Sequence, residues 1–131
     1  MKGSPSWLRS GLSQALSLTL ILAVVLGGSA VLRHWQGDRQ GQALREQARP
    51  GDIVMLSSRS CLYCDRARDW LDAQAVPHSE CFIEHNSACR EQFQARGGLG
   101  TPTFVVRGQT IVGFDRARIL ALLSRPTAAP G

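Results

Sequence analysis

The sequence predicts an α/β domain with a mixed four-stranded sheet, preceded by one transmembrane helix. Apolar, β-branched runs alternate with helix-like stretches in the order βαβαββα between residues 52 and 124. A strand, helix and strand in succession imply a right-handed parallel crossover, and a later hairpin adds antiparallel strands, so helices are expected on both faces of the sheet. A long segment without charged residues precedes this domain.

The first half of the domain predicts two strands that alternate with two helices. An apolar run at residues 53–56 predicts the first strand, and a helix-like stretch follows at residues 65–73. The second strand is expected at residues 78–84, and the second helix at residues 87–95. This half therefore supplies the parallel pair of the sheet.

The second half predicts a hairpin and a final helix. A turn-rich stretch at residues 97–102 leads into two β-branched runs, 103–107 and 110–112, which Gly108-Gln109 joins as a hairpin. Asp115 is a suitable N-cap for a last helix that reaches Leu123. The hairpin makes the sheet mixed.

Two cysteines stand where the first strand gives way to the first helix. The motif is Cys61-Leu62-Tyr63-Cys64. At a helix N-terminus, the unpaired N–H groups and the partial positive charge stabilise a thiolate on Cys61, and the three-residue spacing lets Cys64 close a disulfide on it. Half of a zinc site is the alternative, but it needs two more ligands at suitable spacing. The motif thus predicts a redox-active dithiol, and we expect no metal.

Two further motifs lie downstream in a matching order. They are Thr101-Pro102 before the third strand, and Val112-Gly113-Phe114-Asp115 before the last helix. With the dithiol motif, they make residues 52–124 resemble the glutaredoxin branch of the thioredoxin-like superfamily. The resemblance implies a glutaredoxin-type thioredoxin-like fold and thiol–disulfide oxidoreductase activity in cell redox homeostasis.

The resemblance also implies the roles of individual residues. Cys61 and Cys64 would be catalytic, and a cis peptide bond would precede Pro102 beside them, as X-Pro bonds tolerate. No cofactor beyond the redox-active disulfide is implied, with glutathione as an alternative co-substrate and a protein disulfide as the other substrate class. The expected substrate-binding residues are Tyr63, Thr101, Pro102, Gly113 and Phe114.

Several functional alternatives stay open at the level of sequence. Leu62 stands where glutaredoxins usually have proline, and Ser58 where a lysine is common. The Gly113-Phe114 pair also resembles glutaredoxin-like proteins that take electrons from thioredoxin reductase. A membrane-tethered binding module that holds a client protein or a metal ion without turnover is the alternative from a different functional class.

The chain has a second pair of cysteines, Cys81 and Cys89. Cys81 shares a strand face with Ile83, and Cys89 falls on the expected inner side of its helix, four residues before Phe93. A structural disulfide between them would contribute about 2.6 kcal/mol in the chain-entropy model. Two unpaired buried thiols are one alternative. An electron relay with the Cys61–Cys64 pair, or a metal site that uses all four cysteines, is the other.

The N-terminal third of the chain predicts a membrane anchor. No charged residue occurs between Leu12 and Leu32, and such a helix is about as long as the roughly 30 Å hydrocarbon core of a bilayer. A signal peptide cleaved after Ala30 is the alternative. Residues 1–11 are then expected to form an N-terminal tail, 33–51 a polar tether without core residues, and 125–131 a disordered tail.

The distribution of charge and the number of cysteines bear on the cellular compartment of the domain. The formal net charge is +5, but the arginines are spread over every segment, so we expect no nucleic-acid partner. Basic residues are more numerous after the apolar segment than before it, which favours a cytoplasmic domain. An even set of four cysteines is typical of an oxidising compartment. We expect an inner (plasma) membrane protein with a periplasmic domain, and the cytoplasmic face stays the alternative.

Overall fold

The computed structural model describes the backbone of residues 6–126 and the side chains of residues 14–126. Two compact units divide the chain, Met1–Gly37 and Asp38–Gly131. The expected disorder of the C-terminal tail concerns mainly residues 127–131, which lie outside the described part.

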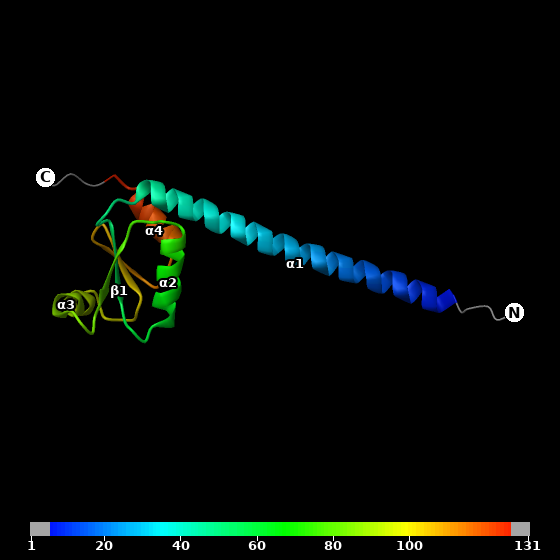
Figure 1. Ribbon diagram of the computed structural model, residues 1–131, viewed down its shortest axis with the longest axis horizontal. Coiled ribbons are helices and arrows are strands. Elements are labelled where there is room, and N and C mark those ends of the chain that lie inside the picture. Colours follow the sequence, from blue (N-terminus) through cyan, green and yellow to red (C-terminus); the bar gives the residue numbers. More distant parts are fainter. Residues whose placement is uncertain (1–5, 127–131) are drawn as a thin grey trace. The chain divides into compact units, whose positions relative to one another are not determined.

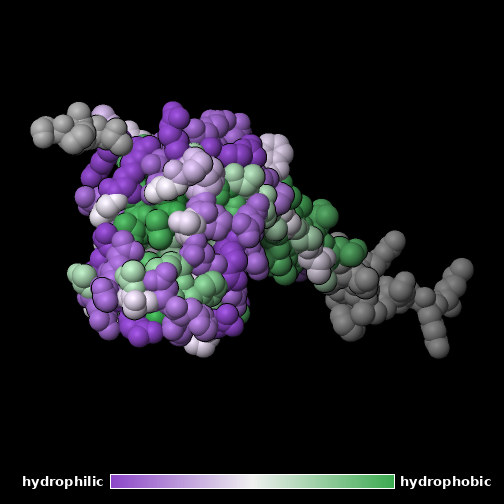
Figure 2. All heavy atoms as spheres, turned by 60° about the vertical axis from the view of Figure 1, so that its left-hand side comes forward, coloured by the Kyte–Doolittle hydropathy of each residue, from purple (hydrophilic) through white to green (hydrophobic). Residues whose placement is uncertain are grey.

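The described part of the first unit is helical. Helix α1 spans Ser6–Gln47, so residues 6–11 are helical and not a separate tail. Within the described side chains, one helix, Gln14–Gln47, is long and apolar enough to cross a membrane by length and composition, and none of its most apolar window is buried. Figure 2 shows part of this helix as a hydrophobic surface. A signal sequence near an N-terminus passes the same test of length and composition.

The second unit is built on a mixed four-stranded sheet in the order β2-β1-β3-β4 (Figure 1). Strand β1 (Ile53–Ser57) pairs in parallel with β2 (Ser79–Phe82) and antiparallel with β3 (Thr103–Val106). Strand β4 (Gln109–Val112) completes the antiparallel hairpin with β3. The predicted thioredoxin-like arrangement is confirmed.

Helices cover both faces of this sheet (Figure 1). The period of two along β1 sends Ile53 and Met55 into a core with α2 (Leu62–Ala73) and α4 (Arg116–Leu123). Val54 and Leu56 point to the other face, where α3 (Ser87–Ala95) packs. Asp115 caps α4 as predicted, because its carboxylate accepts the Arg118 N–H at 3.0 Å.

The hairpin turn lies one residue earlier than predicted. Arg107 and Gly108 have φ values of 47° and 84°, and strand β4 already begins at Gln109. Two successive positive φ values are typical of a type I′ turn, whose twist matches that of the paired strands. Strand β4 thus begins with a polar residue, Gln109, which the pattern of β-branched residues did not identify.

The prediction that residues 33–51 form a polar tether without core residues is wrong in its second half. Helix α1 continues to Gln47, and Leu44 is 0% exposed within the main core, with Ala48 beside it. Gly41 faces Gln74 at the end of α2. Leu44 and Ala48 are only two apolar positions, and two positions are too few to show a periodic apolar face in the sequence.

We expect Leu44→Ala to lower the free energy of unfolding by about 2–5 kcal/mol, because it leaves a cavity in the main core. Arg45→Ala is the matched control, since its exposed side chain lies one residue away and such changes usually shift stability by less than about 0.5 kcal/mol. Urea denaturation of the full-length protein in detergent measures both. Equal stability of the two variants would show that the end of α1 is not part of the folded core.

Candidate active site

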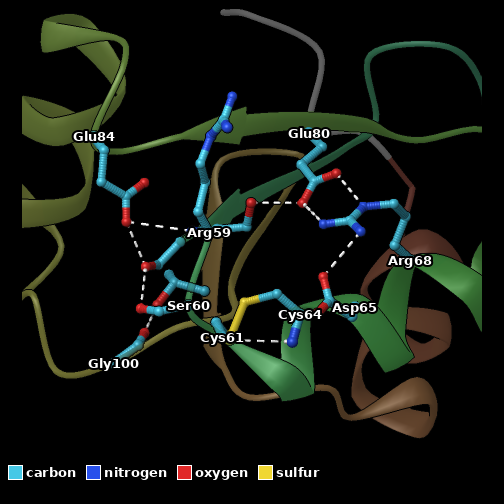
Figure 3. The surroundings of a disulfide bond; sticks show 12 residues. Arg59, Ser60, Cys61, Cys64, Asp65, Arg68, Glu80, Glu84 and Gly100 are labelled. Carbon is cyan, nitrogen blue, oxygen red and sulfur yellow. Dashed lines mark hydrogen bonds and ion pairs between the residues drawn. A yellow bond between two sulfur atoms is a disulfide. The ribbon is translucent and has the colours of Figure 1, made fainter.

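Cys61 occupies the N-cap of α2. Its Sγ accepts the Cys64 N–H at 3.1 Å, and its carbonyl accepts the N–H groups of Cys64 and Asp65 at 3.0 and 3.2 Å. The two sulfurs are joined in a disulfide, with Cα atoms 5.2 Å apart (Figure 3). The Cys61 sulfur therefore lies at a helix N-terminus, a position that favours a thiolate in general.

The two cysteines differ in their access to solvent. Cys64 is 0% exposed beneath the first turn of α2, whereas Cys61 is partly exposed. An incoming disulfide therefore meets Cys61 first. This asymmetry is suited to an attacking thiol and a buried resolving thiol.

A pocket of about 450 Å³ lies beside the first turn of α2. Thr101 and Pro102 are joined by the cis peptide bond that the resemblance implied. The Gly113 N–H donates to the Pro102 carbonyl at 2.8 Å, which holds the end of β4 against the cis-proline loop, and Gly113 has a φ of 83°. All five expected substrate-binding residues line this pocket: Tyr63, Thr101, Pro102, Gly113 and Phe114.

Aromatic side chains form one wall of the site. Phe114 lies with its ring centroid 5.5 Å from that of Trp70 and 5.5 Å from that of Phe104, which is buried in the core. Trp70 is thus partly buried against the core, and the Arg116 guanidinium lies 5.0 Å from its ring centroid. Of these three rings, Phe114 is the one that lines the pocket, and the core packs behind it.

A polar network that sequence reasoning missed lies under the other side of α2. Arg68 binds Glu80 on β2 through two bonds of 2.5 and 2.7 Å, and it also contacts Asp65 at 3.0 Å (Figure 3). The Ser57 hydroxyl donates to the same Glu80 carboxylate at 2.5 Å. Only the three-residue spacing of Asp65 and Arg68 was a signal in the sequence. The network ties α2 to the end of β1, directly before the dithiol.

Burial by itself would raise the pKa of Glu80, but the hydrogen bonds from Arg68 and Ser57 outweigh it and hold that pKa below its ordinary value. A carboxyl whose pKa falls on folding stabilises the native state above its unfolded pKa. That stabilisation disappears as the pH drops through the lower, folded pKa.

We therefore expect Glu80→Gln to be destabilised at pH 7 by about 1–3 kcal/mol, because a charge-assisted pair is lost. Its stability should also fall less steeply than that of the parent below about pH 5, since the group no longer titrates. Denaturation at several pH values measures both effects. The control is Asp69→Asn on the exposed side of α2, and a parallel pH dependence of Glu80→Gln and parent would contradict the account.

The second pair of cysteines is joined on the opposite face of the sheet. Cys81 on β2 and Cys89 on α3 form a disulfide with Cα atoms 6.1 Å apart. Both belong to the smaller core with Leu56, Val105 and Phe93. Within the described residues, no group of three or more histidine, cysteine or acidic side chains is arranged to hold a metal ion.

Comparison with known proteins agrees with this geometry. Residues 53–111 match the family model for glutaredoxin. This stretch of the chain is a glutaredoxin-like domain. The matched stretch runs from β1 into β4 and includes both cysteine pairs and the cis-proline loop, so the family model and the structure place the domain in the same part of the chain.

Solved structures are similar to this part of the chain, and the first of them shares its fold. A mutant of the thioredoxin-like protein BC3987 is 23% identical, with a TM-score of 0.50, and the match covers 56% of this chain and 95% of that one. A glutaredoxin from Archaeoglobus fulgidus is 16% identical (TM-score 0.46), covering 56% of this chain and 87% of the other. A buckwheat glutaredoxin–glutathione complex is 18% identical (TM-score 0.45), covering 68% and 88%. No curated protein matches the chain.

Proposed function

We propose that this protein is a membrane-anchored thiol–disulfide oxidoreductase in which Cys61 attacks and Cys64 resolves. The observation that carries the proposal is the asymmetry of the dithiol. Cys61 is partly exposed and its sulfur receives the Cys64 N–H at the start of α2, whereas Cys64 is 0% exposed and within bonding distance of Cys61. The glutaredoxin domain supports the same reaction class.

The reaction consists of two thiol exchanges. The Cys61 thiolate attacks one sulfur of a substrate disulfide, so a mixed disulfide forms and the other substrate sulfur leaves as a thiolate. The Cys64 thiol then loses its proton and attacks the Cys61 sulfur, which breaks the mixed disulfide and releases the second substrate sulfur. The substrate gains two electrons and is reduced to two thiols. The protein loses two electrons and is left with a disulfide between Cys61 and Cys64, which an external thiol reductant converts back to the dithiol.

The pocket beside the first turn of α2, which Tyr63 lines, supports a polypeptide or glutathione disulfide as substrate. Tyr63 and Leu62 lie between the two cysteines and are 70% and 60% exposed, which leaves apolar surface for an extended chain. The cis Thr101–Pro102 bond and the Gly113-Phe114 segment close the opposite side. Glutathione is the proposed co-substrate. A protein reductase is the alternative source of electrons for the dithiol.

Insulin reduction by the full-length protein in detergent tests the proposed activity. Because the dithiol exchanges with exposed disulfides, we expect the protein to accelerate the precipitation of insulin chains by dithiothreitol. A binding module without turnover would leave the rate at that of dithiothreitol alone. That result would contradict the oxidoreductase hypothesis and favour the hypothesis of a binding module.

The anchor and its compartment belong to the same proposal. We propose that the apolar part of α1 spans the inner membrane and that the glutaredoxin domain faces the periplasm, because two disulfides suit an oxidising compartment. Alkaline phosphatase fused to the C-terminus should be active in this orientation. An inactive phosphatase together with an active cytoplasmic reporter at the same position would place the domain in the cytoplasm.

A further inference from the structure

The loop between β2 and α3 touches the turn that leads to Cys61. The Ile83 N–H donates to the Ser57 carbonyl at 3.0 Å, which continues the pairing of β1 and β2 beyond the strands. One residue later, the Glu84 carboxylate accepts the Ser58 hydroxyl, and it accepts the Arg59 N–H at 3.3 Å (Figure 3). One side chain thus holds two successive residues of the turn.

The same turn sets where Cys61 lies. The Cys61 N–H donates to the Ser58 carbonyl at 3.2 Å, and the hydroxyls of Ser58 and Ser60 lie 3.3 Å apart. Only two residues separate Ser58 from Cys61. A shift of the turn therefore moves the sulfur relative to the N–H groups of α2.

The loop that carries Glu84 is itself held in place. The Arg90 guanidinium donates to the carbonyls of Ile83 and Glu84 at 2.9 and 3.0 Å. The Asn86 side chain caps α3, and the disulfide between Cys81 and Cys89 closes the loop at its base. Glu84 is exposed, yet its backbone is fixed on both sides, which makes it a firm support for its neighbour.

We propose that Glu84 is a positioning residue for the attacking thiol: it holds the Ser58–Arg59 turn so that the Cys61 sulfur faces the N-terminus of α2. The inference rests on the proposed function, in which Cys61 is the nucleophile. Glu84 does so from a loop that the second disulfide closes, and it does not touch the substrate or the reacting sulfur atoms.

A positioning role and a simple charge effect of Glu84 predict opposite changes in the reactivity of Cys61 when Glu84 is removed. The Ser58 hydroxyl lowers the pKa of Glu84 below its ordinary value, so the side chain is a carboxylate at neutral pH. A negative charge acting only through space disfavours a nearby thiolate, and removing it would make Cys61 more reactive. A positioning residue acts in the opposite direction, because its loss moves the sulfur away from the helix terminus.

The test measures the alkylation rate of Cys61 by iodoacetamide between pH 5 and pH 9 in the full-length protein, with Cys64→Ser as background and the modified residue identified by mass spectrometry. We expect Glu84→Ala to slow alkylation at pH 6 by about threefold to tenfold, since less thiolate is present. Glu84→Gln keeps an acceptor oxygen and should stay within about twofold of the background protein. Glu91→Gln, an exposed carboxylate on α3, is the charge-matched control.

Faster alkylation in both Glu84 variants would assign the effect to charge and overturn the proposal, as would an unchanged rate in Glu84→Ala. If Glu84→Ala fails to fold, Ser58→Ala removes the other partner of the same hydrogen bond and carries the test, with slower alkylation expected. Alkylation needs no turnover, so it is independent of the insulin assay. A protein that alkylates as expected but does not reduce insulin would refute the oxidoreductase and leave the positioning role in place.

Discussion

Replacing Cys61 by serine will abolish disulfide exchange, whereas replacing Cys64 by serine will trap a mixed disulfide with the substrate. Cys61 is the accessible sulfur at the start of α2, so without it no attack takes place. Without Cys64, which is buried next to Cys61, the attack still occurs but nothing resolves the product. The turnover rate should fall by about a thousandfold or more in Cys61→Ser.

The two outcomes are separated by non-reducing electrophoresis after incubation with a disulfide substrate. Cys64→Ser should accumulate a thiol-sensitive adduct in which mass spectrometry finds Cys61, and Cys61→Ser should form none. Asp69→Asn, an exposed change on the same helix, should behave like the parent. Adducts of equal yield in both cysteine variants would contradict the assigned order of attack, and full activity in both would contradict the dithiol mechanism altogether.

We expect removal of the apolar part of α1 to release the protein from the membrane in soluble form, provided that the cut lies before Asp38. The full-length protein should sediment with membranes and resist carbonate extraction, because an uncharged helix of this length has no protein surface to cover it. A protein that begins at Gln36 keeps Leu44 and Ala48, which fill the core, and should be soluble and retain thiol exchange.

A cut at Gly51 is the matched comparison. It removes the same apolar segment but also takes Leu44 out of the core, so we expect a protein that aggregates or unfolds at lower temperature. Circular dichroism and size-exclusion chromatography distinguish the two truncated proteins. A mature full-length product that starts at Val31 and stays in the soluble fraction would show instead that a signal peptide is cleaved after Ala30.

The positions of most elements could be predicted from the sequence because their causes are local. A continuous apolar run marked β1, and the side chain of Asp115 marked the start of α4. The dithiol motif predicted its own place at a helix start because the spacing of Cys61 and Cys64 is short enough to be read within one turn. Boundaries were less exact: α2 begins at Leu62, three residues before the predicted start.

Both the sequence and the tertiary structure were needed to group the residues of the site. The cis-proline loop and the Gly113-Phe114 segment were singled out by resemblance to a family. Only the order of strands in the sheet, with β3 between β1 and β4, brings these segments beside Tyr63 in the first turn of α2. Their shared pocket is therefore a consequence of topology that no local pattern contains.

By itself, the sequence determined the fold class, the redox-active dithiol and the apolar segment, because each follows from residue types at short spacing. Only the tertiary structure decided that Leu44 belongs to the core, that Arg68 pairs with Glu80, and that Glu84 supports the turn before Cys61. Each of these contacts joins residues 12 or more positions apart in the sequence. Long-range contacts of single polar or apolar side chains leave no periodic pattern, so only the folded chain reveals them.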